Sequence, residues 1–170
     1  MRIVVITAMC ALALGACSSG TEQEATTAAL PSVSASPTGP VVLTTEQAGE
    51  RYLKYICRSN EALDRLNKSG FEQIFIGETL SPDEVAALKN LARVDQKSAR
   101  ALQDSDYVWP DAVQKPVERV AVQLYEQSAE ALDIAKSGEA SVLNSGTGKS
   151  ATLVRLKLDL PPRGKGCGKQ

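Results

Sequence analysis

Three segments of the chain place apolar side chains at helical spacing, and this periodicity constrains the fold more than any other feature of the sequence. The first segment begins at Thr44, which has the pattern of a capping box with Gln47, and it ends at Ser69-Gly70. Its apolar stripe consists of Ala48, Tyr52, Ile56, Leu63 and Leu66. We expect a long amphipathic helix over these residues.

The second segment has the clearest start signal. Ser81 is a favoured N-cap residue, and Pro82 suits the first helical position. Asp83 and Glu84 follow in the first turn, where the helix dipole favours negative charge. The apolar residues that continue the helical spacing are Val85, Leu88, Leu91, Ala92, Ala99 and Leu102. A second helix is therefore predicted.

The third segment contains a proline near its start. Its helical face consists of Val117, Val120, Ala121, Leu124, Ser128, Ala131, Leu132 and Ala135, and the pattern stops near Gly138. Proline inside a helix removes a backbone hydrogen bond and clashes with the preceding turn. We therefore expect a short turn from Trp109 to Gln114 and the main helix from about Pro116.

The fourth segment fits two structures. The run from Val154 to Leu160 alternates apolar and polar residues, as a half-buried strand does. The same region fits one face of a helix, formed by Leu153, Leu156 and Leu160. A strand needs a partner, and the other β-like run, Phe71 to Ile76, is short and does not alternate. We favour a helix from about Ser150 to Leu158.

Together these segments predict an all-α fold, a small four-helix domain over residues 44–170. This part of the chain has 127 residues with 18 Lys and Arg and 18 Asp and Glu, so it is formally neutral. A chain of that length buries roughly two thirds of its unfolded surface and can sustain its own core.

Residues 1–16 have the layout of a secretory signal peptide, with Arg2, an apolar run and the small pair Gly15-Ala16. The apolar run is shorter than the roughly 20 residues of a membrane-spanning helix. Leu14-Gly15-Ala16-Cys17 resembles the lipobox of bacterial lipoproteins. The resemblance implies that Cys17 receives a diacylglyceryl group and becomes the first residue. The alternative is an ordinary signal peptide with a Cys at the cleavage site by chance.

Residues 17–43 are predicted to form a disordered tether behind the lipidated Cys17. From Ser18 to Leu43 the chain is rich in Ser, Thr, Ala and Pro, and its charges are Glu22 and Glu24. A random coil of this length has an end-to-end distance of about 25–30 Å. We expect it to hold the domain close to the outer, extracytoplasmic face of the cell membrane.

Cys57 and Cys167 are the cysteines that remain after processing and lipidation. An exported chain meets an oxidising environment, so an intramolecular disulfide between them is the default interpretation. A redox-active pair is disfavoured because the chain has no Cys-x-x-Cys motif, and intermolecular bridging is the other alternative.

Two short motifs imitate ligand sites. Asn144 to Ser150 reads like the end of a phosphate-binding loop, but Leu143 replaces its first glycine and no long apolar strand precedes it. Asp104-Ser105-Asp106 starts like a calcium loop, but Tyr107-Val108-Trp109 follows where further oxygen ligands are needed. We expect no nucleotide and no metal at these loops, and we expect Trp109 to be a core or domain-edge residue.

Composition excludes several classes of site. The chain has no His, which removes His-based general bases, Ser-His-Asp and Cys-His nucleophiles and zinc sites with imidazole ligands. Its seven aromatic residues are too few and scattered for stacking on single-stranded nucleic acid.

Charge is unevenly distributed along the domain. Residues 149–170 carry a net charge of +5, and residues 44–148 carry a net charge of −5. The basic end either contacts an anionic surface or neutralises the acidic helices, and we favour the second.

A second resemblance covers most of the domain. Its residues are Tyr52, Cys57 and Asn60 on the first helix, Trp109-Pro110, and Arg155, Leu158, Leu160, Pro161 and Cys167 near the end. This order is similar to small uncharacterised lipoproteins of actinobacteria. The resemblance implies a four-helix domain closed by one disulfide, and it implies no known activity, cofactor or catalytic residue.

The sequence thus predicts a membrane-anchored, non-enzymatic module of the cell envelope, with an envelope protein or an anionic cell-wall polymer as its partner besides the membrane. The alternative is a lipoprotein that binds a small ligand in a polar pocket between helices. We expect no cofactor and no nucleic-acid partner.

Overall fold

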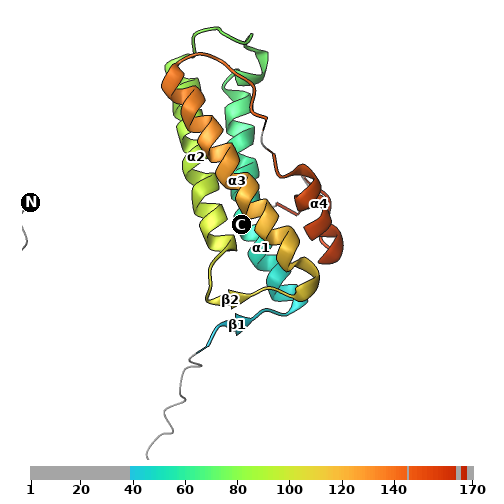
Figure 1. Ribbon diagram of the computed structural model, residues 1–170. Helices are drawn as coiled ribbons and strands as arrows, with labels where there is room; N and C mark the ends of the chain where they lie inside the picture. Colours follow the sequence, from blue (N-terminus) through green and yellow to red (C-terminus); the bar gives the residue numbers. More distant parts are fainter. Residues whose placement is uncertain (1–38, 145, 164–165, 168–170) are drawn as a thin grey trace, which may run out of the picture. The chain divides into compact units, whose positions relative to one another are not determined.

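The computed structural model describes residues 39–144, 146–163 and 166–167, and it confirms the predicted all-α fold (Figure 1). The four α-helices within these residues are α1 (Thr45–Lys68), α2 (Pro82–Leu102), α3 (Asp111–Ser137) and α4 (Gly148–Lys157). A short 3-10 helix, η1 (Phe71–Gln73), follows α1. The three long helices run side by side, and the short α4 packs against α3.

The predicted starts of α1 and α2 are confirmed at the atomic level. The Thr44 hydroxyl accepts from the backbone N–H of Gln47 at 3.2 Å, and the Gln47 side chain accepts from the Thr44 N–H at 3.0 Å. Ser81 and Glu84 form the same reciprocal pair at the start of α2. Each capping box satisfies two N–H groups that a helix start otherwise leaves without a partner.

The prediction that the third helix starts at about Pro116 is wrong. Helix α3 begins at Asp111, so Pro116 lies inside it. Interior proline costs about 3 kcal/mol, but residues on both sides of it offset that cost. Val113, Val117 and Val120 are fully buried, and each contributes about 1.5–3 kcal/mol by burial. Leu132 is also not part of the buried face, because it is exposed while Ile134 is buried.

The fourth segment is a helix, as favoured, but its buried face differs from the predicted one. The buried residues are Ala151, Val154, Arg155 and Leu158, whereas Leu156 is 75% exposed. The apolar alternation does not predict which side of α4 faces the core. A helix this short buries only one narrow face. Arg155 occupies a core position, which no hydrophobic pattern would predict.

Two strands of two residues each lie next to the bundle end at which α1 starts. β1 (Val41–Val42) pairs in parallel with β2 (Tyr107–Val108). Leu43 follows β1 and is buried. The folded part therefore includes residues 41–43, which the sequence placed in the tether.

The core consists of two apolar clusters. The first cluster lies near the β1–β2 end and includes Tyr52, Trp109, Leu124 and Val154. The second cluster lies toward the η1 end and includes Leu66, Leu88, Leu91 and Ile134. The residues between them on α1, α2 and α3 are buried and polar: Ser59, Asp95, Ser98, Gln127 and Ser128. Both clusters lie wholly within residues 43–167, so this part of the chain carries its own core, and we expect it to fold on its own.

The structure confirms the intramolecular disulfide between Cys57 and Cys167. The two Cα atoms are 5.4 Å apart, although 110 residues separate them in the sequence. The bond attaches the end of the chain to the middle of α1, next to the first cluster.

Candidate functional site

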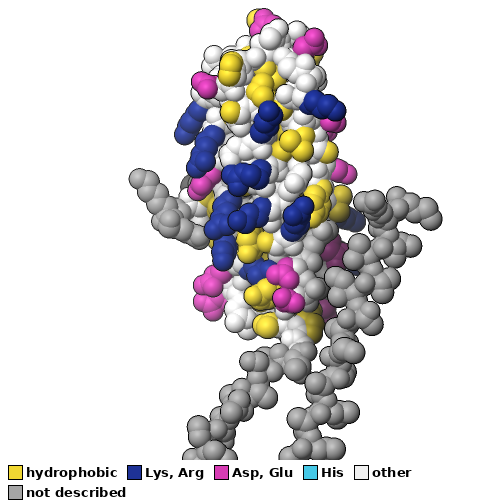
Figure 2. All heavy atoms as spheres, turned by 90° about the vertical axis from the view of Figure 1, so that its left-hand side faces the viewer, with side chains coloured by type: hydrophobic (Ala, Val, Ile, Leu, Met, Phe, Trp, Pro, Cys, Tyr) yellow, Lys and Arg dark blue, Asp and Glu magenta, His cyan; other side chains and the backbone are white. Residues whose placement is uncertain are grey.

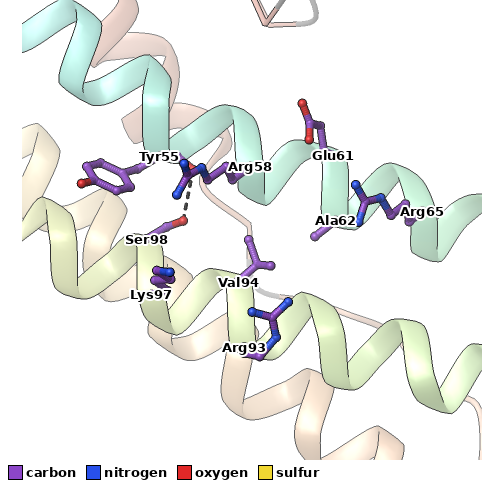
Figure 3. Close-up of a pocket in the computed structure, with 9 residues that line it drawn as sticks. All are labelled: Tyr55, Arg58, Glu61, Ala62, Arg65, Arg93, Val94, Lys97 and Ser98. Carbon is purple, nitrogen blue, oxygen red and sulfur yellow. Dashed lines mark hydrogen bonds between the residues drawn. The ribbon is translucent and has the colours of Figure 1, made fainter. Parts of the chain in front are cut away.

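A groove between α1 and α2 carries a concentration of positive charge (Figure 3). It has a volume of about 210 Å³. Arg58 and Arg65 border it from α1, and Arg93 and Lys97 border it from α2. Glu61 is the one carboxylate among the described residues that line it. Ala62 and Val94 lie between the two helices and form an apolar floor.

Helical spacing brings these cations to one side. Arg58 and Arg65 are two helical turns apart, about 10 Å along α1, and Arg93 and Lys97 are about one turn apart on α2. Arg51 and Lys54 precede them on α1, and Lys89 and Arg100 flank the second pair on α2. Figure 2 shows Lys and Arg side chains gathered over the middle of this side of the molecule.

The four groove cations have no carboxylate partner among the described residues. Arg93 donates to the side-chain oxygen of Asn90 at 2.8 Å, and Arg58 lies 6.0 Å from the centre of the Tyr55 ring. Arg51 differs, because it forms a salt bridge with Asp104 at 3.0 Å and stacks over Tyr107 at 3.6 Å. The charge of Arg51 is thus used within the fold, and the charges of the groove are available to a ligand.

The aromatic ring at one end of the groove lies close to three cations of α1. The Tyr55 ring has Arg51 at 5.5 Å, Lys54 at 5.7 Å and Arg58 at 6.0 Å. An aromatic face attracts a cation within about 6 Å, so this ring helps hold the three side chains together. Ser98 fixes the wall of the groove by donating to the Tyr55 carbonyl at 3.1 Å.

A buried carboxyl lies on α2 directly beside the groove residues Val94 and Ser98. Asp95 is fully buried, and burial raises its pKa to about 7, while the Ser59 side chain opposes the rise. Neither carboxylate oxygen has a partner within hydrogen-bond distance and angle in the described part of the chain. Asp95 is therefore partly protonated near neutral pH and does not offset the groove charge as a permanent anion.

The groove offers charge, hydrogen bonds and an apolar floor. Its described lining residues include no thiol, and the one hydroxyl nucleophile among them outside the Tyr ring, Ser98, already donates to the backbone. Among the described residues, no three His, Cys, Asp or Glu side chains lie together as a metal site requires. None of the described helices is long and apolar enough to cross a membrane. This chemistry suits the binding of an anion.

The sequence-predicted sites lie elsewhere. Cys17 is outside the described residues. Thr147 to Lys149 form the start of α4, and the strands that the structure describes do not include one leading into that loop. Asp104 pairs with Arg51, and the Asp106 N–H donates to Asp104 at 3.1 Å. Trp109 is buried and donates to the Leu102 carbonyl at 3.0 Å, which confirms its core position.

The basic groove was missed because charge was summed along the sequence rather than around each helix. Residues 44–148 are acidic as a whole, and the sum hides the cations that share a face. The signal that reveals them is the spacing of Arg51, Lys54, Arg58 and Arg65 on α1, together with the spacing of Lys89, Arg93, Lys97 and Arg100 on α2. Asp95 was missed although it interrupts the apolar stripe of α2.

Comparison with known proteins adds no relative: no protein-family model, no curated protein and no solved structure matches this chain.

Proposed function

We propose that this protein is a lipid-anchored extracytoplasmic module that binds an anionic cell-envelope polymer in the groove between α1 and α2. Its role is interaction within the envelope and not an enzymatic step. The observation that carries the proposal is the set of four cations around the groove that lack a carboxylate partner in the described structure.

Unpaired cations on adjacent helices repel one another, and a polyanion relieves that repulsion. Arg58, Arg65 and Arg93 present planar guanidinium groups that match phosphate or carboxylate groups with two hydrogen bonds each. The further cations Lys54, Lys89 and Arg100 extend the charge along both helices. A linear polymer with repeated negative groups can contact several of these side chains at once.

A polymer fits this face better than a membrane surface does. Proteins that lie on a bilayer insert large apolar side chains beside their basic residues. The large hydrophobic residues that are exposed in the structure lie outside α1 and α2, for example at Phe75, Ile76 and Leu156. The basic face therefore has charge without apolar anchors among the described residues.

The proposed anchor is compatible with that arrangement. A diacylglyceryl group on Cys17 would supply membrane attachment by itself, because two acyl chains give stable binding. The tether of residues 17–38 would then place the domain where it meets polymers next to the membrane. The groove would bind its partner without needing to contact lipid.

The groove is tested with residues 39–170, prepared with the disulfide formed, in a binding titration against poly(glycerol phosphate) and polygalacturonate. We expect both polyanions to bind and neutral dextran not to bind. Replacing Arg58, Arg65, Arg93 and Lys97 with Gln should weaken binding at least about tenfold, since each charge-assisted contact is worth more than about 1 kcal/mol. Added salt should weaken the wild-type interaction because exposed charges are screened.

The matched control removes the same number of charges from another side. Lys115, Arg119 and Lys136 are exposed on α3, and Lys157 is exposed on α4. Replacing these four with Gln changes the net charge equally and should leave most of the affinity. Equal losses in both variants would show that net charge alone causes binding and would reject the groove. Binding to anionic vesicles without binding to either polymer would reject the polymer.

The anchor is tested separately in an actinobacterial host. We expect Cys17→Ser to move the protein from the membrane fraction to the medium or to leave an uncleaved precursor. Normal maturation with unchanged membrane retention would refute lipidation at Cys17, while leaving the polymer-binding result to stand or fall by itself.

A further inference from the structure

A second groove, on the side of the molecule formed by α1, α3 and the start of α4, has a different lining. It has a volume of about 500 Å³, within the usual range for a small-molecule site. Its polar and charged lining residues are Ser59, Asn60, Gln123, Gln127, Asn144, Thr147, Lys149 and Arg163. The described lining residues include no Asp or Glu and no aromatic residue.

A buried arginine that has no carboxylate partner among the described residues lies next to this groove. Arg155 is 5% exposed, and one of its guanidinium nitrogens donates to the Pro161 carbonyl. Its Nη2 atom is buried and has no hydrogen-bond partner among the described residues. A buried charge without a counter-charge is costly, so an anion bound beside Arg155 would be stabilised.

The space beside Arg155 connects this charge to the groove. A cavity of about 20 Å³ is lined by Arg155 and Ala151, and it shares Asn60, Thr147 and Arg163 with the larger groove. That volume holds about one water molecule or one oxygen of an anionic group. Arg155 and Arg163 both line this cavity, and Arg163 and Lys149 line the groove next to it, so three positive charges lie along the two spaces.

The N-terminus of α4 points to the same kind of ligand. The first N–H groups of a helix have no partner within the helix, and Thr147 supplies no side-chain cap to them. Both the free N–H groups and the helix dipole favour negative charge at this end. Lys149 lies in the first turn, where a cation is unfavourable for the helix itself.

Two glutamine side chains extend the site away from the charged end. Gln127 is 6% exposed, and its amide forms no hydrogen bond with a described residue, although it lines the groove. The side-chain oxygen of Gln123 is buried and also has no partner there. Glu130, by contrast, accepts from the Asn144 N–H at 2.9 Å and does not line the groove. The buried Gln123 oxygen and the Gln127 amide that lines the groove are groups that a ligand with hydroxyl groups would satisfy.

We propose that this groove binds a small hydroxylated acid, with its carboxylate or phosphate group at Arg155, Arg163 and the start of α4, and its hydroxyl groups at Gln127, Gln123 and Asn60. The site is independent of the polymer groove between α1 and α2. An amino acid fits less well, because none of the described lining residues is a carboxylate that would hold its ammonium group. A nucleotide fits less well, because none of them is an aromatic ring that would stack on its base.

The test uses nuclear magnetic resonance on ¹⁵N-labelled residues 39–170 with the disulfide formed. The probes are glucuronate, which carries a carboxylate, and glucose 1-phosphate, which carries a phosphate. We expect one or both to shift the backbone signals of residues 146–149 and the side-chain amide signals of Asn60 and Gln127. Neutral glucose should leave these signals unchanged, and whichever acid binds more tightly identifies the anionic group.

Variants separate the ligand site from the fold. Lys149→Ala changes an exposed residue, so it should fold normally and weaken binding about tenfold through the lost charge. Gln127→Met removes the unpartnered amide, so it should weaken binding while thermal stability stays equal or rises. Lys157→Ala, at the other end of α4, and Lys97→Gln, in the α1–α2 groove, should bind both acids as the wild type does.

Several results would overturn the proposal. The absence of shifts with both acids would do so, as would equal shifts with glucose. Shifts with inorganic phosphate but with neither hydroxylated acid would indicate an adventitious ion only. Tighter binding of ATP than of glucose 1-phosphate would identify a nucleotide site instead. Each of these outcomes leaves the binding of polymers to the α1–α2 groove unaffected.

Discussion

The two apolar clusters belong to one bundle, but the chain assembles them in different ways. The first cluster takes residues from Leu43 to Leu158, and Cys167 packs against it. The second cluster takes residues from Ala62 to Ala140, on the three long helices and in the segments that follow α1 and α3. Helix α4, the β1–β2 pair and the disulfide all support the first cluster.

The second cluster is closed by short connections. Thr79 pairs with Glu139 across the two loops, and the Leu80 N–H donates to the Gly138 carbonyl at 2.9 Å. Phe75 and Ile76 in the first of these loops are 76% and 73% exposed. The packing of the first cluster therefore depends on parts of the chain outside the three long helices, whereas the packing of the second depends on those helices and the segments next to them.

Breaking the disulfide should lower the free energy of unfolding more than any other change proposed here, and it should loosen the first cluster more than the second. Cys57→Ser releases a loop that spans 110 residues, and the expected loss is about 2–5 kcal/mol of unfolding free energy. That loss corresponds to a melting temperature about 10 °C lower for a domain of this size. Thermal unfolding measures the shift, and hydrogen exchange should show greater loss of protection in α4 than in residues near Leu88.

The control for this prediction is the partner residue. Cys167→Ser removes the same bond and should give the same loss, and the double variant should not exceed either single one. Free thiols at both positions in the oxidised wild type would contradict the disulfide. Equal loss of exchange protection in both clusters would contradict the difference between them.

The buried carboxyl between the clusters should give the next largest effect. The pKa of Asp95 is raised from 3.8 to about 7, so the folded state holds its proton more tightly than the unfolded state does. Stability should therefore be highest in mild acid and fall as the pH rises from about 4 to about 7. Asp95→Asn should remove this dependence and stabilise the protein at pH 8 by about 2–4 kcal/mol relative to the wild type.

Urea unfolding at pH 5 and pH 8 measures the Asp95 effect. At pH 5 the two proteins should differ less than at pH 8, because the folded carboxyl still keeps its proton and only the unfolded one has ionised. Asp133→Asn, at an exposed position on α3, serves as the matched control and should behave as the wild type at both pH values. A variant that is less stable than the wild type at pH 8 would show that the folded state stabilises ionised Asp95, which contradicts the raised pKa.

Replacing the interior proline tests how the first cluster offsets a local defect. Pro116→Ala should restore the hydrogen bond to the Ala112 carbonyl and stabilise the domain by about 1–2 kcal/mol, after allowance for a more flexible unfolded chain. Calorimetry measures the change. Destabilisation would mean that the half-buried proline ring contributes packing that outweighs the missing hydrogen bond.

Local sequence signals predicted the parts of this fold that local chemistry determines. The capping boxes at Thr44 and Ser81 are visible in the sequence because each needs residues that are three positions apart. The start of α3 and the buried face of α4 are different, since tertiary burial decides both. The free energy gained by burying Val113 helps offset the cost of a proline inside the helix at Pro116. Arg155 is buried in the core although its side chain is charged.

The candidate sites were less visible than the fold. The disulfide followed from counting cysteines, because Cys57 and Cys167 were the pair left over. The groove between α1 and α2 joins residues about 30 to 40 positions apart, and its charge appears only when each helix is considered as a surface. The groove next to Arg155 depends on burial and missing partners, which no spacing of residues encodes.

The smallest expected effect concerns the ion pair that holds α1 to the loop before β2. The Arg51 guanidinium meets Asp104 at 3.0 Å and also donates to the Ala101 carbonyl at 2.9 Å. Asp104→Asn keeps a side-chain oxygen that can accept from the Asp106 N–H, but it removes the charge. Because the pair is partly exposed, the expected loss is about 0.5–1 kcal/mol, and it should shrink as salt screens the charges. Urea unfolding at low and high salt measures it. A loss above about 2 kcal/mol would mean that this contact, and not the disulfide alone, secures the first cluster at the β1–β2 end.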